Sequence, residues 1–125
     1  MDSITSMTPE QWEMSIYEGA IEKWGATNQI IKAMEELGEL QRALARHVLG
    51  VLRPDLFTPE DAEENEVNLS KERADVMVML NQMDVILGDN SDMELAVLED
   101  LERRVFGYGK DSDRDQLLQD AGFEL

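Results

Sequence analysis

The chain has 125 residues, with 28 acidic and 11 basic side chains, one histidine and no cysteine, so its formal net charge is −17. The lack of cysteine excludes a disulfide scaffold, a thiolate zinc site and a cysteine nucleophile, and the acidic charge argues against binding of nucleic acid. The N-terminal sequence lacks the basic and apolar regions of a signal peptide, and no apolar run is long enough to span a membrane. We therefore expect a cytoplasmic protein with no membrane contact.

Glycine and proline residues divide the chain into four predicted helices. The first begins with the pattern of a capping box, in which Thr8 is the N-cap residue, Pro9 the first helical residue and Gln11 the third. This helix is expected to run to about Trp24 and to end at Gly25, because glycine is the residue most often found just beyond a helix.

Thr27 or Asn28 is expected to cap the second helix, which is predicted to run to about Leu49. Gly50 then takes the position that follows a helix C-terminus. Residues 51–67 contain two of the three prolines and a run of acidic residues. This segment is predicted to be a loop with at most one helical turn after its second proline.

The third helix is expected over residues 68–87, ending at Gly88. Ser91 and Glu94 have the spacing of another capping box, so the fourth helix is predicted to begin there and to end before Gly107. Helices two and three would each be about 30 Å long. Two such helices and two shorter ones favour a four-helix arrangement.

No segment shows the alternating pattern of a β-strand, so the chain is predicted to be all-α. Its length fits a single domain over residues 1–125. The core of this domain is expected at about 8–107. A polar tail at 108–125 is expected to add a short helix around 115–120.

The third predicted helix is apolar around much of its circumference, because Val78 and Val85 lie opposite Met79 and Met83. A single thin bundle would leave part of that surface uncovered. We therefore expect a homo-oligomer, most simply a two-fold dimer whose subunits complete each other's core.

Acidic and apolar residues separate on the second predicted helix. Glu35, Glu36 and Glu39 share an arc of about 100° around its axis. The helix is therefore expected to have one acidic face and one separate packing face. The apolar residues assigned to the packing face are Ile30, Met34, Leu37, Leu40, Leu44 and Val48.

Two carboxylates of the third helix lie on its apolar side. Glu72 falls within the apolar stripe and Asp75 at its margin. An ionised carboxylate is costly to bury without a partner, and the available arginines (Arg42, Arg46 and Arg103) are too few for five facing acids. A hard divalent cation with oxygen ligands, Mg²⁺ or Mn²⁺, meets the need.

Two other metal sites are excluded by spacing. His47 has Leu44 three residues before it, so the Glu-x-x-His pattern of di-iron bundles is absent. Residues 111–115 begin like a calcium-binding loop, but Gln116 and Gly122 occupy the positions that require glycine and glutamate. This segment is interpreted as an acidic turn.

The paired carboxylate pattern, E-E-x-x-E at 35–39 and E-x-x-D at 72–75, resembles the signature of the all-α nucleoside triphosphate pyrophosphohydrolases, the superfamily of MazG and the dimeric dUTPases. The resemblance covers about residues 25–104. It implies a MazG-type bundle, completed as a homodimer or homotetramer. It also implies Mg²⁺-dependent (or Mn²⁺-dependent) hydrolysis of an NTP or dNTP to the monophosphate and pyrophosphate, as in housecleaning of the nucleotide pool.

The resemblance also implies roles for the five acids. Glu36, Glu39, Glu72 and Asp75 match the metal ligands of the family. The remaining glutamate, Glu35, would bind a second ion or act as the general base.

Several other residues are expected to contact the substrate. Basic residues near the site would steady the phosphates, Gln82 would hydrogen-bond near the motif, and Asn28 and Gln29 would read a base edge. Aromatic residues of the first helix are candidates for stacking on a base, although core or interface packing is the commoner role. The expected substrate-binding residues are Lys32, Lys71, Gln82, Arg103, Arg104 and Asn28, and the aromatic candidates are Trp12, Tyr17 and Trp24.

Two departures from the family pattern keep a second function open. Asp100 stands where relatives carry a lysine three residues before Arg103, and the interval between the two motifs is longer than usual, which the expected loop 51–67 would absorb. The alternative is a catalytically silent helical bundle that binds nucleotide or a protein partner.

Overall fold

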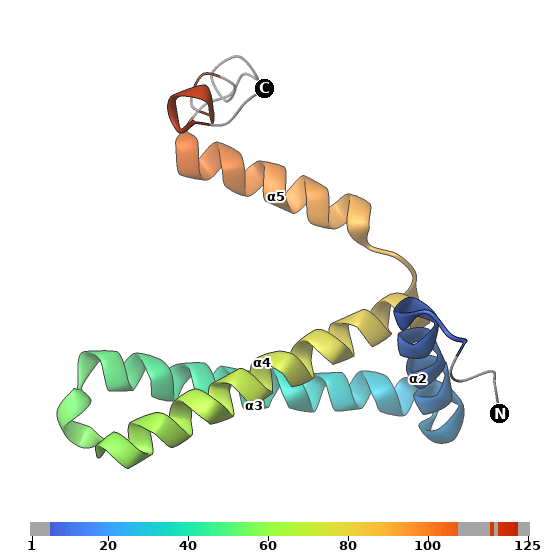
Figure 1. The fold of residues 1–125 in the computed structure, drawn as a ribbon, viewed down its shortest axis with the longest axis horizontal. Helices are drawn as coiled ribbons and strands as arrows, with labels where there is room; N and C mark the ends of the chain where they lie inside the picture. Colours follow the sequence, from blue (N-terminus) through green and yellow to red (C-terminus); the bar gives the residue numbers. More distant parts are fainter. Residues whose placement is uncertain (1–5, 108–115, 117, 123–125) are drawn as a thin grey trace. The chain divides into compact units, whose positions relative to one another are not determined.

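The computed structural model describes residues 6–107, 116 and 118–122, and these residues form helices and turns with no strand among them (Figure 1). The prediction of an all-α protein is confirmed for this part of the chain. The chain consists of two compact units, Met1–Gly88 and Asp89–Leu125. The elements are α2 (Pro9–Trp24), α3 (Ala26–Leu52), the 3-10 turn η1 (Pro54–Leu56), α4 (Pro59–Leu87) and α5 (Ser91–Phe106).

Helix α2 begins and ends where the sequence predicts. The Thr8 hydroxyl accepts a hydrogen bond from the Gln11 backbone N–H (3.1 Å), and the Gln11 side chain accepts one from the Thr8 N–H (3.0 Å). The helix ends at Trp24 because Gly25 has φ +88°, a conformation that suits glycine.

Helix α3 continues past the residue expected to end it. Gly50 lies inside the helix, so its predicted position beyond the C-terminus is wrong. The helix ends instead before Pro54, because a proline disfavours helical geometry in the residue that precedes it, and Arg53 has φ −135° and ψ 67°. The ring of Phe57 packs against Gly50, 3.9 Å from the point where a Cβ atom would lie.

The predicted loop over 51–67 is also wrong, because most of it is helical. Helix α4 begins at Pro59, and the Thr58 side chain accepts a hydrogen bond from the Asp61 N–H (3.1 Å). The Asp61 carboxylate in turn accepts one from the Thr58 N–H (3.2 Å), which completes a capping box. Only residues 53–58 therefore connect α3 to α4.

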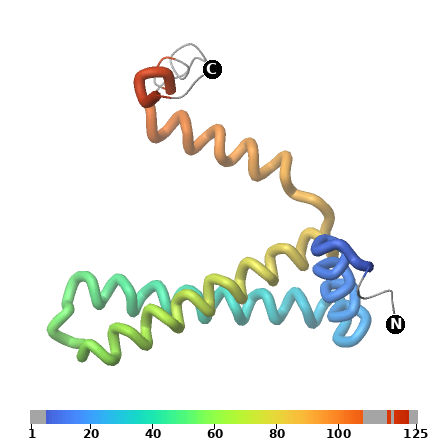
Figure 2. The backbone as a smooth tube through the Cα atoms, viewed as in Figure 1, coloured from blue at the N-terminus to red at the C-terminus, as the bar shows by residue number. Residues whose placement is uncertain are grey.

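Helices α3 and α4 form a long antiparallel hairpin, and α2 lies across the end at which α3 begins and α4 ends (Figures 1 and 2). Small side chains, Ala33 and Ala43, are buried on α3 where it meets α4, and Leu69, Val76 and Met79 are buried on α4. Small residues at a helix crossing allow the two axes to approach closely.

Four of the six apolar residues assigned to the packing face of α3 are exposed in this chain, whereas Ile30 and Leu40 are half-buried. Met34 is 65% exposed and Val48 is 52% exposed, whereas Glu36 is buried. The small residues and Glu36 contact α4, and the apolar stripe lies beside this contact. The other exposed members of the stripe are Leu37 and Leu44.

The second unit contains α5, which ends as predicted at Gly107, a left-handed residue with φ +67°. The predicted capping box is wrong, because Asn90 precedes the helix and the Ser91 hydroxyl donates to Asp89 Oδ2 (2.8 Å). Of the predicted tail helix, Gln116 and residues 118–120 are helical. The acidic turn expected at 111–115 lies outside the described residues.

Among the described helices, none combines the length and apolar character that crossing a membrane requires.

Candidate metal centre

Three glutamates meet where α3 and α4 cross. Glu36 and Glu39 come from α3 and Glu72 from α4, and one carboxylate oxygen of each lies within 4.8 Å of the others. Glu36 and Glu39 are close because residues three apart lie one turn apart on the same side of a helix. The antiparallel course of α4 then brings Glu72 opposite them.

Two of these carboxylates are buried without full compensation. The side chains of Glu36 and Glu72 are 9% and 8% exposed. The Oε2 atom of each has no hydrogen-bond partner among the described residues. Buried polar atoms are nearly always paired in folded proteins, so these two oxygens mark a position that could hold a ligand.

The electrostatics of the cluster favour a proton or a cation. Burial raises the pKa of Glu72 above its ordinary value, and the negative charge of Glu39 raises it further. The ammonium group of Lys71, 3.9 Å from Glu72 Oε1, acts in the opposite direction but does not cancel these effects.

Two lysines flank the cluster and pair with its acids. Lys32 Nζ lies 3.1 Å from Glu36 Oε1 and 3.7 Å from Glu35 Oε2. Lys71 Nζ lies 2.8 Å from Asp75 Oδ2. The hydrogen bonds to Glu36 and Asp75 raise the pKa values of Lys32 and Lys71 respectively. Both pairs have an i,i+4 spacing that is visible in the sequence.

The structure therefore brings together three of the four predicted metal ligands. Asp75 lies one turn from Glu72, but its side chain is 34% exposed and paired with Lys71. The side chain of Glu35 is 61% exposed and lies beside Lys32. The roles predicted for these two residues remain predictions.

The other predicted substrate residues have different surroundings. Gln82 is 2% exposed, and its Nε2 has no partner among the described residues. Asn28 Nδ2 donates to the Trp24 carbonyl oxygen at 2.8 Å. In the second unit, Arg103 and Arg104 both pair with Asp100, at 3.7 and 2.8 Å.

A hollow of about 570 Å³ adjoins the cluster on the side of Lys32 and Glu35. Its wall includes Ile31 and Met79, which the sequence analysis did not assign to a site. Met79 was assigned to the core by its place in the apolar stripe, and nothing in a helical pattern distinguishes a core methionine from one that borders a pocket.

All three clustered side chains are carboxylates, a donor set that suits a hard cation such as Mg²⁺ or Mn²⁺. Comparisons with models of known protein families, with curated proteins and with solved structures found no match to this chain.

Proposed function

We propose that the protein is a Mg²⁺-dependent nucleoside triphosphate pyrophosphohydrolase of the MazG-like, all-α type. The observation that supports this most directly is the convergence of Glu36, Glu39 and Glu72, from both halves of the E-E-x-x-E…E-x-x-D pattern, with two buried oxygens that lack partners among the described residues. A solvated acidic surface would expose those oxygens to water.

In this proposal Glu36, Glu39 and Glu72 would hold the metal, and Asp75 would be a fourth ligand if released from its contact with Lys71. When bound, a divalent cation neutralises phosphate charge and lowers the pKa of a coordinated water. The acidic protein thereby binds a polyanionic substrate that its own charge would repel.

The side chains around the cluster have separate tasks. Lys32 and Lys71 move from their carboxylate partners to the phosphate oxygens, since both ammonium groups are exposed and lie at the edge of the cluster. Glu35, exposed beside Lys32, accepts a proton from the attacking water. The water oxygen forms the new bond to phosphorus, and pyrophosphate leaves.

We also propose that a second copy of the chain covers the exposed apolar stripe of α3, giving a homodimer or a dimer of dimers. Exposed apolar area of this extent is typical of interfaces. Replacing Leu44, which is 45% exposed, by glutamate is expected to shift the molecular mass measured by light scattering from that of an oligomer to that of a monomer. A monomeric wild-type protein would contradict this part of the proposal.

The central experiment measures pyrophosphate release from a panel of NTPs and dNTPs with and without Mg²⁺ or Mn²⁺. Glu36→Gln is expected to abolish release, because the isosteric amide keeps the shape of the side chain but loses the metal-binding charge. Glu64→Gln, on the exposed part of α4, is the matched control and should leave release unchanged. Wild-type rates in the Glu36 variant would contradict the site.

The second candidate function, a silent bundle that binds nucleotide or a protein, has its own supporting observation. Asp75 is paired with Lys71, and Arg103 and Arg104 are both paired with Asp100. If these ion pairs persist when metal binds, the phosphates lose three of their expected contacts. Nucleotide and metal binding without turnover of any substrate in the panel would favour this function.

A further inference from the structure

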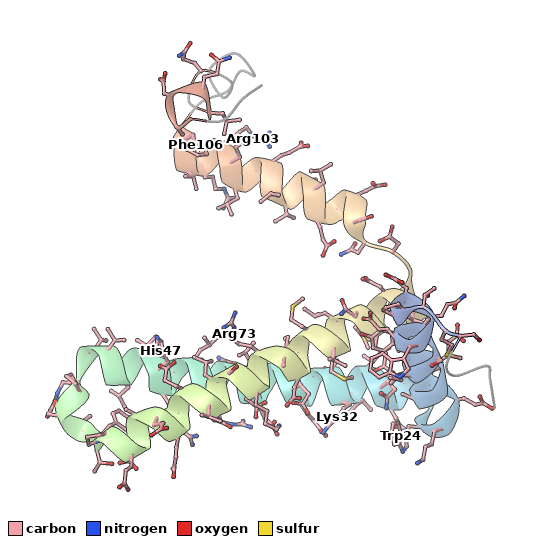
Figure 3. All side chains as sticks on the ribbon, in the orientation of Figure 1. Trp24, Lys32, His47, Arg73, Arg103 and Phe106 are labelled. Carbon is pink, nitrogen blue, oxygen red and sulfur yellow. The ribbon has the colours of Figure 1, made fainter. Side chains whose placement is uncertain are left out.

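We propose that a second hollow, at the turn between α3 and α4, binds a small aromatic carboxylate. The hollow has a volume of about 390 Å³, within the usual range for pockets that hold small ligands. Figure 3 shows His47, which lines it, on the part of α3 near the turn, whereas Lys32 lies nearer to α2. We define the turn pocket by six of its lining residues, Arg46, Gly50, Val51, Pro54, Phe57 and Asn65.

The turn pocket is separate from the candidate metal centre. Arg46 follows Glu39 by seven residues on α3, so the helix advances about 10 Å from the glutamate cluster to the pocket. None of the clustered glutamates lines the pocket. The inference therefore goes beyond the proposed function and does not depend on it.

Gly50 is the residue of the pocket wall that the fold itself does not explain. It lies inside α3, where glycine is less favourable than alanine. Its φ is not positive, and a Cβ atom would lie 3.9 Å from the Phe57 ring, an ordinary contact distance. Neither the backbone conformation nor the packing of this chain therefore requires glycine here. The missing side chain leaves space in the hollow, which a bound ligand would use.

Most of the remaining wall is apolar. Val51 lines it from the end of α3, Pro54 from the η1 turn and Ala62 from α4. The half-buried ring of Phe57 lines it from the connection between the two helices. An aromatic ligand gains from contact with such a ring beyond the apolar area that it buries. The wall therefore favours a ligand with an aromatic body.

Arg46 provides the charge that the ligand has to match. Its side chain is exposed and forms no ion pair with any residue that the structure describes, although the chain has 28 acidic residues. The carboxylate in the pocket lining, that of Glu66, is paired instead with His47, at 3.0 Å. A guanidinium group binds a carboxylate through two parallel hydrogen bonds. The Asn65 amide, in the same lining, is a further donor.

A carboxylate fits this lining better than a phosphate or an amine. A phosphate dianion needs more positive charge than one guanidinium group beside Glu66 supplies. An amine would be repelled by Arg46, and Glu66 already has a partner. One negative charge on an aromatic body matches both the guanidinium group and the apolar wall.

The test uses 2-naphthoate as the probe and 2-naphthamide, which has nearly the same shape without the charge, as its control. Isothermal titration calorimetry of the full chain, without divalent cations, is expected to give saturable binding of 2-naphthoate with a Kd below about 1 mM. The amide should bind at least about tenfold more weakly. Addition of Mg²⁺ should leave the Kd of 2-naphthoate unchanged, because the metal centre is a separate site.

The first variants test the guanidinium group. Arg46→Gln should weaken 2-naphthoate binding about tenfold and leave the weak binding of the amide unchanged. Arg46→Lys keeps the charge without the planar group, so it should restore part of the affinity. Arg42→Gln is the matched control, because Arg42 lies one turn earlier on α3 and does not line the pocket. It should bind 2-naphthoate as the wild type does.

The second set of variants tests the space at Gly50. Gly50→Leu should abolish 2-naphthoate binding, and Gly50→Ala, which displaces less of the ligand, should weaken it several-fold. The thermal midpoint of unfolding, measured by circular dichroism, should be higher in Gly50→Ala than in the wild type, because alanine favours a helix. Gly19→Ala and Gly19→Leu are the matched controls, since Gly19 lies within α2 with open space around it. Both should leave binding unchanged.

The outcomes that would overturn the proposal are distinct. Equal affinity for 2-naphthoate and 2-naphthamide, or wild-type affinity in Arg46→Gln, would overturn the assignment of a carboxylate. Wild-type affinity in Gly50→Leu, or no saturable binding of 2-naphthoate, would overturn the turn pocket itself. Binding that appears only with Mg²⁺ would assign the probe to the glutamate cluster and would also overturn the proposal. None of these measurements involves pyrophosphate release, so the hydrolase and the turn pocket can fail independently.

Discussion

Glu36 and Glu72 face each other across the contact between α3 and α4, with one carboxylate oxygen of each within 4.8 Å of the other. Both side chains are at least nine-tenths buried, and each has one oxygen without a hydrogen-bond partner in the part of the chain that the structure describes. Two like charges in such a place oppose the packing of the helices that carry them. A chain selected only for stability would have other residues at these two positions. Residues that lower stability are common at functional sites.

Glu72→Gln is expected to raise the thermal midpoint of unfolding by a few degrees when no metal is present. The amide removes one negative charge from the cluster and donates hydrogen bonds to the neighbouring carboxylates. Thermal unfolding followed by circular dichroism measures the change, with Glu64→Gln as an exposed control on the same helix.

Metal should reverse this order of stability. Mn²⁺ is expected to raise the midpoint of the wild-type protein, because a ligand that binds only the folded state stabilises it, and to have little effect on Glu72→Gln. Equal responses of both proteins to Mn²⁺ would show that Glu72 is not a ligand.

The raised pKa of Glu72 predicts a pH dependence of stability. In the window between its ordinary value of 4.5 and its raised value, the folded protein binds more protons than the unfolded chain. The free energy of unfolding should therefore fall as pH rises through this window. The destabilisation that ionised Glu72 causes is absent below this pH window and complete above it.

Urea unfolding at a series of pH values, compared between wild type and Glu72→Gln, isolates this contribution. The wild-type protein should lose stability relative to the variant as pH rises from about 4.5 toward neutrality. Parallel pH profiles would mean that Glu72 titrates normally.

Lys71→Met should change metal and nucleotide binding in opposite directions. Without its ammonium group, Asp75 is released from the 2.8 Å ion pair and the cluster becomes more negative, so the dissociation constant for Mn²⁺ should fall roughly 3- to 10-fold. Nucleotide binding should weaken by about tenfold, because a phosphate contact is lost.

Calorimetric titrations with Mn²⁺ alone, and with a nucleotide analogue in Mg²⁺, measure the two effects. Lys71→Arg is the control that keeps the charge, and it should resemble the wild type for Mn²⁺. If Lys71→Met weakened both ligands, the lysine would have a structural role rather than a role in exchanging partners.

Thr58→Ala should destabilise the protein by about 1 kcal/mol, because it removes the hydroxyl that caps the first turn of α4. Thr58→Ser keeps the hydroxyl and should have less than half of this effect. Urea unfolding gives both values. An unchanged free energy of unfolding in Thr58→Ala would indicate that α4 gains nothing from beginning at Pro59.

Local signals predicted much of the secondary structure. Capping boxes and helix-ending glycines correctly predicted the bounds of the first helix. They also predicted the end of the third helix at Gly88 and of the fourth at Gly107. The two errors near the hairpin turn have one cause each. Gly50 resembles the glycine that follows a helix, but it lies inside α3, where the Phe57 ring packs against it. The acid-rich segment after Thr58 resembles a loop, although Thr58 begins the same kind of capping box as Thr8.

The candidate site was predictable in part. Helical periodicity placed Glu72 on the packing side of α4, and the structure agrees. The same periodicity assigned the apolar stripe of α3 to the core, but four of its six residues are exposed within one chain. A helical period does not indicate which face of a helix packs against which neighbour. Which carboxylates form ion pairs with Lys32 and Lys71 also depends on side-chain conformation, and a helical projection does not describe it.

The short turn at residues 53–58 determines how the site is assembled. Glu39 lies 14 residues before Arg53, and Glu72 lies 14 residues after Thr58, so the two carboxylates are the same distance from the turn along their helices. One residue inserted into either arm would shift its glutamate by about 1.5 Å along the axis and rotate it by about 100°. The spacing between the motifs is therefore a geometric constraint in its own right: paired additions of whole turns to both arms preserve the meeting of the acids, whereas an addition to one arm separates them.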